Sequence, residues 1–196
     1  MTKNNFNIEM SNSLHINEEE WQFLYKKINK WSISTKHRSF SWRLYNGVLF
    51  TNKDLTRFGF KESAKCSFCS EISQNREHLL LTCSGIRVFQ NAVLARFNNL
   101  FHNKTIDSRL LLVGCLDMSK KDTLSEACDL IIMLMNRNIY YNNFHENKLS
   151  VDGFTNEVKA MERTEYAIAE RKGKLGFHLA KWESIGDILG YSILAN

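Results

Sequence analysis

The sequence predicts an all-α fold, a helical bundle with an embedded CCHC zinc knuckle. The first reason is that proline is absent from all 196 residues. Average usage would give roughly ten prolines in a chain of this length, and proline disrupts helix interiors most. The second is that apolar residues recur with the helical period, whereas no alternating run is long enough for a strand. The third is one stretch, from Cys66 to Cys83, that reads C-x2-C-x8-H-x4-C.

The chain opens with residues 1–15, which are polar and without periodicity, and which we predict to be a disordered lead-in. A helix is expected to begin at Asn17, because residues 18–20 are all glutamate and lysines occupy the last turn. This order of charges suits the helix dipole. The apolar stripe of the helix consists of Trp21, Leu24, Tyr25, Ile28 and Trp31.

A second helix is predicted over residues 35–49. Its apolar residues cover a wide arc, which indicates packing against two neighbours. The narrow polar face that remains is the first candidate for phosphate contact, and it consists of Lys36, Ser39, Arg43 and Asn46. Thr51 is then expected to cap a short helix that stops at Gly59.

Helices are also predicted over residues 86–101, 120–145, 154–172 and 175–189, with a short apolar piece at 110–113. Residues 130–135 are apolar on every side, so the helix over 120–145 should be the most buried, with a buried strand as the alternative. Glu165 falls on the core stripe of its helix, where a buried structural carboxylate needs a partner. We divide the chain into basic helices with the zinc-binding part, 16–102, and a helical carboxy-terminal scaffold, 103–196.

The residues Cys66, Cys69, His78 and Cys83 form a candidate metal site. A C-x2-C turn points two sulfurs inward, and the imidazole and third thiol complete the four-ligand set of a closed structural zinc site. Free structural cysteines are the alternative. Cys115 and Cys128 lie outside the set and are expected to be small core residues.

Positive charge is concentrated just before this candidate site. Residues 22–65 carry a net charge of +8, residues 1–21 carry −3, and residues 66–196 are balanced. A basic segment beside a zinc module suggests an anionic partner such as nucleic acid, although an ordinary solvated face would show the same charge. No apolar run approaches the roughly 20 residues of a membrane span, and no secretion signal is recognisable. We therefore expect no membrane partner and a location in the nucleus, the cytoplasm or both.

The run from Phe40 to Asn52, the Leu55–Gly59 segment and the C-x2-C…H-x4-C set resemble the zinc-binding domain downstream of the polymerase in LINE-type (non-LTR) retrotransposon reverse transcriptases. Leu110–Gly114 and the stretch from Met161 to Trp182 are similar to the carboxy-terminal region of such proteins. The resemblance spans about residues 20–190. Phe50 stands where that family usually has proline.

The resemblance implies a module that binds RNA or target DNA during target-primed reverse transcription, with Zn²⁺ held by the four residues named above. The chain shows no paired aspartates of the kind that two-metal nucleotidyl transfer needs, so we expect it to carry no enzyme activity. A zinc deaminase is disfavoured as well, because it needs His-x-Glu before Cys-x-x-Cys and an open coordination position. The alternatives are a module that docks on the polymerase and a non-functional relic of the element.

Several side chains are candidates for contact with nucleic acid. Phe68 and Trp42 could stack on bases, although core packing is the expected role of Trp42. The candidates for phosphate contact are Lys36, Arg38, Arg43, Lys53, Arg57, Lys61 and Lys65.

Overall fold

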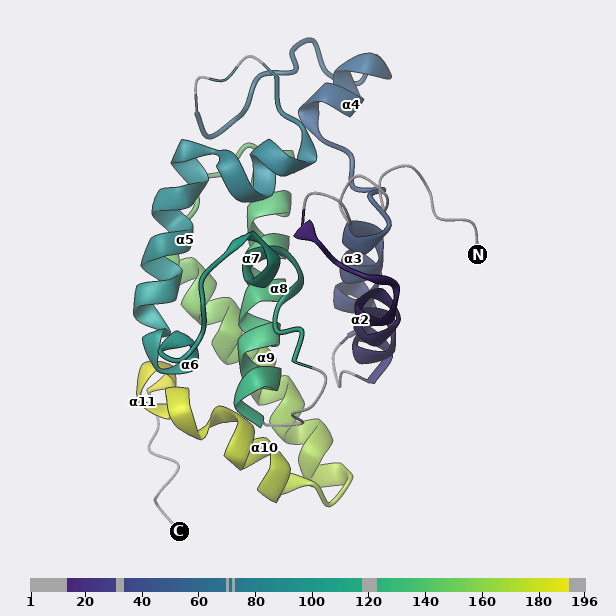
Figure 1. Ribbon diagram of the computed structural model, residues 1–196. Helices are drawn as coiled ribbons and strands as arrows, with labels where there is room; N and C mark the ends of the chain where they lie inside the picture. Colours follow the sequence, from purple (N-terminus) through teal and green to yellow (C-terminus); the bar gives the residue numbers. More distant parts are fainter. Residues whose placement is uncertain (1–13, 31–33, 70, 72, 118–122, 191–196) are drawn as a thin grey trace.

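The computed structural model describes residues 14–30, 34–69, 71, 73–117 and 123–190. These residues form helices and connecting turns with no strand among them, which confirms the predicted all-α class. The longest helix, α8 (Thr123–Phe144), runs through the middle of the molecule (Figure 1). All side chains from Leu130 to Met135 are buried, as expected for a segment that is apolar on every side. The predicted lead-in, residues 1–15, lies almost entirely outside the described part of the chain.

Helices α2 (Glu18–Lys30) and α3 (Thr35–Tyr45) pack against each other, and α3 also contacts α8. The start of α2 is fixed by a reciprocal cap, in which the side chains of Asn17 and Glu20 each accept a hydrogen bond from the other's backbone N–H. The predicted second helix was too long, since α3 ends at Tyr45 rather than at Leu49. Asn46 ends it by donating from Nδ2 to the carbonyl oxygen of Trp42 at 2.8 Å.

A short helix, α4 (Asn52–Arg57), stands at one end of the molecule beside the loop that leads to the metal cluster (Figure 1). Thr51 caps it as predicted, through a capping box with Asp54.

The second half of the chain packs around α8 with α5 (Ser84–Arg96), α6 (Asn98–Phe101), α7 (Ser108–Val113), α9 (Val151–Arg171), α10 (Leu175–Trp182) and α11 (Gly186–Leu189). Two predicted continuous helices are interrupted. The first breaks at Phe97, whose fully buried ring packs edge-on to Phe154, and the second breaks into the 3-10 turn Glu183–Ile185 before α11. Two apolar residues of these helices, Val88 and Leu179, are exposed.

One cluster of buried side chains extends from Leu14 to Leu189, with α8 contacting helices on both sides of residue 102. The division into 16–102 and 103–196 therefore stays a prediction. Among the described residues, no helix is both long and apolar enough to cross a membrane.

Candidate metal centre

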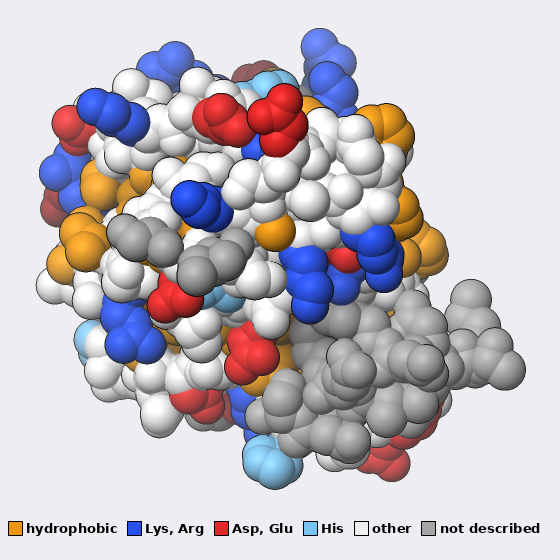
Figure 2. Space-filling model, turned by 90° about the horizontal axis from the view of Figure 1, so that it is seen from above, with side chains coloured by type: hydrophobic (Ala, Val, Ile, Leu, Met, Phe, Trp, Pro, Cys, Tyr) orange, Lys and Arg blue, Asp and Glu red, His pale blue; other side chains and the backbone are white. Residues whose placement is uncertain are grey.

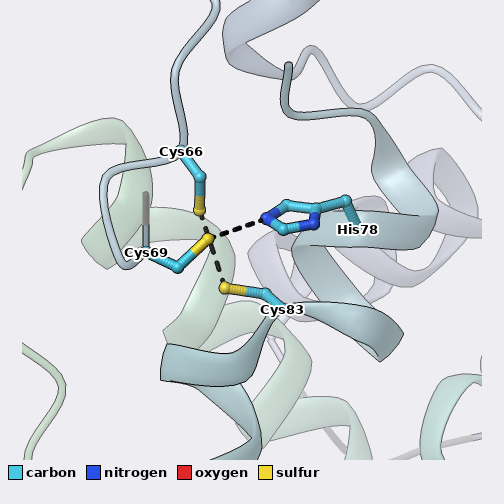
Figure 3. A group of neighbouring side chains, drawn as sticks. All are labelled: Cys66, Cys69, His78 and Cys83. Atoms are coloured by element: carbon cyan, nitrogen blue, oxygen red, sulfur yellow. Dashed lines mark hydrogen bonds between the residues drawn. The ribbon is translucent and has the colours of Figure 1, made fainter. Parts of the chain in front are cut away.

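Three cysteines and one histidine meet where the loop after α4 returns to the helical core. Cys66 and Cys69 come from that loop, His78 is the first residue of the π-helix η1 (His78–Thr82), and Cys83 lies between η1 and α5. Their ligand atoms all lie within 4.8 Å of one another. The four side chains point toward one common space (Figure 3). The structure thus brings together all four residues that the spacing singled out.

The distances within the cluster fit a tetrahedral zinc ion. The Sγ atoms of Cys66 and Cys83 are 3.6 Å apart, and Cys69 Sγ lies 3.3 Å from His78 Nε2. With Zn–S bonds of about 2.3 Å, tetrahedral geometry places two sulfur ligands about 3.8 Å apart. Three thiols and one imidazole also match the ligand types of structural zinc sites, and four protein ligands leave no coordination position for water or substrate.

The π-helix explains how His78 and Cys83 reach the same ion. The backbone N–H of Cys83 donates to the carbonyl oxygen of His78 at 2.9 Å, which is the i→i+5 bond of a π turn. Residues five apart therefore lie on the same side of η1. Asn75 fixes the start of this turn, since its Oδ1 accepts from the His78 N–H at 2.7 Å.

Close packing brings the first cysteine pair against the start of α5. A Cβ atom added at Gly85 would collide with the carbonyl oxygen of Phe68. Glycine therefore lets the Cys66–Cys69 turn approach the backbone that carries Cys83. Gly85, two residues after Cys83, is visible in the sequence, but its contact with Phe68 is not.

Sequence reasoning missed Gln74, a fully buried side chain beside the cluster. Its Nε2 donates to Cys66 Sγ at 3.3 Å and to Asn143 Oδ1 at 2.7 Å. Its Oε1 accepts from the Asn52 N–H and from Asn143 Nδ2. Gln74 thus connects the metal loop to α4 on one side and to α8 on the other. Nothing in its sequence context signals this role, because Asn143 is far away along the chain.

The thiols at the cluster differ in acidity. Burial raises the pKa of Cys66, but hydrogen bonds from the Phe68 N–H and from Gln74 outweigh it, and the pKa is lowered to about 7. Burial raises the pKa of Cys83 to about 12, with the neighbouring thiols acting in the same direction. The Cys66 sulfur therefore has the surroundings that favour a thiolate, the form that binds metal.

The predicted phosphate-contacting residues differ in exposure and in their partners. Lys36, Lys53, Arg57 and Lys65 are exposed, and Arg38 is partly buried. Lys61 pairs with Glu146 at 2.9 Å, while Arg43 is partly buried and donates from Nη2 to Tyr141 Oη at 3.4 Å. Seen from the end that carries α4, Lys and Arg side chains are spread over the surface with acidic side chains between them (Figure 2).

The two aromatic candidates for base stacking differ in exposure. Trp42 is 52% exposed, so its expected core packing is wrong. It lines a pocket together with residues of α2. Phe68 is partly buried and packs against the core cluster.

Glu165 lies buried between α9 and α10. Its carboxylate accepts from Lys181 Nζ at 2.8 and 2.9 Å and from Trp182 Nε1 at 2.9 Å. This carboxylate therefore has a charged partner and a neutral donor, both from α10.

Comparison with known proteins agrees with the chemistry of the cluster. Residues 6–89 match the protein family described as zinc-binding in reverse transcriptase. The matched stretch contains all four residues of the cluster. No curated protein and no solved structure matches the chain. Taken with the Cys₃His cluster, the family match makes zinc the cofactor of this part of the chain.

Proposed function

We propose that Cys66, Cys69, His78 and Cys83 hold one structural Zn²⁺ in a nucleic-acid-binding module. In this proposal the chain is the carboxy-terminal part of a LINE-type (non-LTR) retrotransposon reverse transcriptase. It binds RNA or target DNA, in the nucleus or cytoplasm, in support of target-primed reverse transcription. In this role the metal is structural and not catalytic, because a metal with four protein ligands has no position for a reacting water.

One observation carries the proposal, a surface of aromatic and basic side chains around α4. We call it the α4 surface and define it as Phe50, Lys53, Arg57, Phe58, Phe60 and Lys65. All six side chains are exposed, and Phe60 is 77% exposed. Contiguous patches of exposed apolar side chains mark binding sites. Aromatic rings beside cations allow single-stranded nucleic acid to stack its bases and to place its phosphates on positive charge.

The rings and charges of the α4 surface are held together. Phe50 and Phe58 meet edge to face with centroids 5.6 Å apart, and the Arg57 guanidinium lies 4.8 Å from the centre of the Phe58 ring. Lys53 and Arg57 are four residues apart on α4 and therefore share a face. A strand stacking on the rings would have both cations within reach of its phosphates.

The metal loop supports the position of α4. The Asn52 side chain donates to the Lys65 carbonyl oxygen at 2.7 Å, and the Lys53 N–H donates to the Gln74 carbonyl oxygen at 3.3 Å. Lys65 directly precedes Cys66 and Gln74 lies between Cys69 and His78, so a metal that fixes this loop also fixes the first turn of α4. This is the physical role that we assign to zinc, namely stabilising a binding surface.

The test is salt-dependent binding of the full chain to single-stranded RNA and to duplex DNA. Each lost phosphate contact should reduce the slope of log K against log salt by about 0.7 for single strands and 0.9 for duplex DNA. The triple variant Lys53→Ala, Arg57→Ala, Lys65→Ala should therefore bind more weakly and with a shallower slope. The matched control is Arg171→Ala, Lys172→Ala, Lys174→Ala, which removes the same charges from an exposed turn at the far end of α9. Equal losses of affinity in the two triple variants would show that the α4 surface is not the binding site.

Absence of binding at low salt would reject the nucleic-acid function altogether. It would favour the alternative module that docks on the polymerase portion of the same element, or a relic without binding activity. A specific observation favours docking as the second candidate. Three apolar side chains of the α9–α10 pair, Tyr166, Phe177 and Leu179, are exposed on the carboxy-terminal half of the chain.

A further inference from the structure

Helices α2 and α3 face each other across a pocket of about 260 Å³. Residues spaced i, i+3 and i+4 on α2 form one wall, and residues spaced i, i+3, i+4 and i+7 on α3 form the other. The lining consists of Tyr25, Ile28 and Asn29 from α2 and Thr35, Arg38, Ser39 and Trp42 from α3. Each helix thus presents one continuous stripe to the pocket. The pocket is separate from both the metal cluster and the α4 surface.

The walls of the pocket are suited to a flat aromatic ring. Trp42 supplies a large indole that lines the pocket and is half exposed, so its face is accessible to a ligand. Tyr25 is held in place because its ring packs against Trp21 and Tyr45, and because its hydroxyl donates to Asn46 Oδ1 at 3.2 Å. The Asn29 amide and the Thr35 and Ser39 hydroxyls add groups that both donate and accept hydrogen bonds.

The charge at the pocket is positive. Helix α3 contains no acidic residue, and Lys36 is exposed two positions before Arg38. Within the described part of the chain, the Arg38 guanidinium has no carboxylate partner. The cations Lys27, Lys61 and Lys181, by contrast, each have one. An uncompensated guanidinium at the edge of an aromatic pocket favours a ligand that joins a flat ring to an anion.

We propose that this pocket binds one nucleotide unit, with the base stacked on Trp42 and the phosphate on Arg38. The inference rests on the proposed nucleic-acid function and names a second site for it, one that reads the base. The pocket volume fits this ligand, because pockets for drug-sized molecules measure roughly 300–1,000 Å³ and a pocket of about 260 Å³ suits a single base. The nucleotide is free or part of a single strand, and the experiment separates these two sources.

The experiment follows tryptophan fluorescence of the full chain during titration with adenosine 5′-monophosphate and with a short oligodeoxyadenylate. An abasic strand of equal length serves as the ligand control. Stacking should quench Trp42, and Trp42→Phe should remove that quenching while the remaining tryptophans still report. Trp42→Ala should weaken binding roughly 10- to 100-fold, and Arg38→Gln should weaken binding of the monophosphate more than binding of adenosine.

The matched control variants are Phe177→Ala, which removes an aromatic ring that is 53% exposed elsewhere, and Arg163→Gln, which removes an exposed cation from α9. Neither should change binding. Quenching by both ligands means that a free nucleotide suffices, and quenching by the oligonucleotide alone means that the base is taken from a strand. Three results would overturn the assignment of this pocket as a nucleotide site. They are absence of quenching by both ligands, equal quenching by the abasic strand, and equal effects of Trp42→Ala and Phe177→Ala on binding.

Failure of this inference is distinguishable from failure of the proposed function. If strands bind through the α4 surface but Trp42→Ala has no effect, the function stands and the pocket is rejected. If the monophosphate quenches Trp42 but no RNA or DNA binds at low salt, the pocket stands as a nucleotide site and the proposed function is rejected.

Discussion

Asp129 is a carboxylate in the middle of the helical core, with only 3% of its surface exposed. It accepts from Lys27 Nζ at 2.9 Å and from the Cys115 N–H at 2.6 Å. Burial raises the pKa of this carboxyl, and Lys27 and the N–H act against that rise. A buried charge is tolerated only with such partners. The pair therefore fixes where α2 lies against α8, using a lysine that the charge pattern would assign to the solvent.

Gly114 is the residue that makes room for this carboxylate. Its φ of 78° and ψ of −157° belong to a region that essentially only glycine adopts, and an added Cβ would collide with Asp129 Oδ1. Gly114→Ala should therefore lower the free energy of unfolding by about 2–4 kcal/mol, measured by urea denaturation. The control is Gly173→Ala, which also has a positive φ, of 64°, but open space around it. Gly173→Ala should lower the free energy of unfolding by only about 1–2 kcal/mol. Equal losses in the two variants would show that the Asp129 side chain can move away from an added Cβ without loss of stability.

At the residue scale, the sequence could identify groups that need partners, but it could not identify the partners. Glu165 was predictable as a buried carboxylate because it falls on an apolar stripe, whereas its donors follow from how α10 packs on α9. The four residues of the metal cluster were predictable because their spacing is local. Gln74 was not, since its contacts depend on α4 and α8 meeting the loop.

At the element scale, the position of most helices follows from periodicity and capping, while their breaks follow from tertiary packing. Thr51 and Asn17 mark two helix starts that the structure contains. The break at Phe97 has no glycine or proline to signal it, because it results from the fully buried ring in contact with α9. The π turn at His78 is equally invisible to a pattern of apolar residues.

The junction between α9 and α10 depends on Glu165 and its two donors. Glu165→Gln keeps an acceptor oxygen for Trp182 but leaves the buried Lys181 ammonium without an opposite charge. The free energy of unfolding should fall by about 3 kcal/mol, whereas affinity for nucleic acid should not change. Urea denaturation and the binding assay described above measure the two effects.

A matched control for this change is Glu157→Gln, also on α9. Glu157 pairs with Arg137 at 2.8 Å, but both side chains are more than a fifth exposed. Water can replace the lost carboxylate beside Arg137, so the free energy of unfolding should fall by less than about 1 kcal/mol. If both variants lose equal stability, burial of the Glu165 pair contributes nothing.

At the scale of the whole molecule, one core joins the metal loop to the helices around α8. Cys66 and Cys83 belong to the same buried cluster as α8, and η1 contacts α5, α7 and α8 directly. Gln74 adds a polar connection through Asn143 of α8. Local unfolding of the loop would expose apolar surface from several helices at once. This arrangement favours a single cooperative transition over independent unfolding of residues 16–102 and 103–196.

Removal of zinc should therefore destabilise the whole chain. Structural zinc supplies about 10–16 kcal/mol in finger peptides, but this loop also has hydrogen bonds to α4 and α8, so we expect a loss of about 5 kcal/mol. For a chain of this length, such a loss lowers the melting temperature by roughly 10–20 °C. Cys69→Ser should have the same effect and should abolish zinc binding, measured by atomic emission.

Circular dichroism and tryptophan fluorescence should report the same midpoint with and without zinc, because the helices and the loop share one core. The matched control is Cys115→Ser, which changes a thiol outside the cluster and should leave the zinc content intact. Two separate transitions, with zinc removal moving only the first, would instead support two folding units divided near residue 102. An unchanged melting temperature in metal-free protein would contradict the structural role of zinc, since a loop that keeps its shape without the ion would gain nothing from binding it.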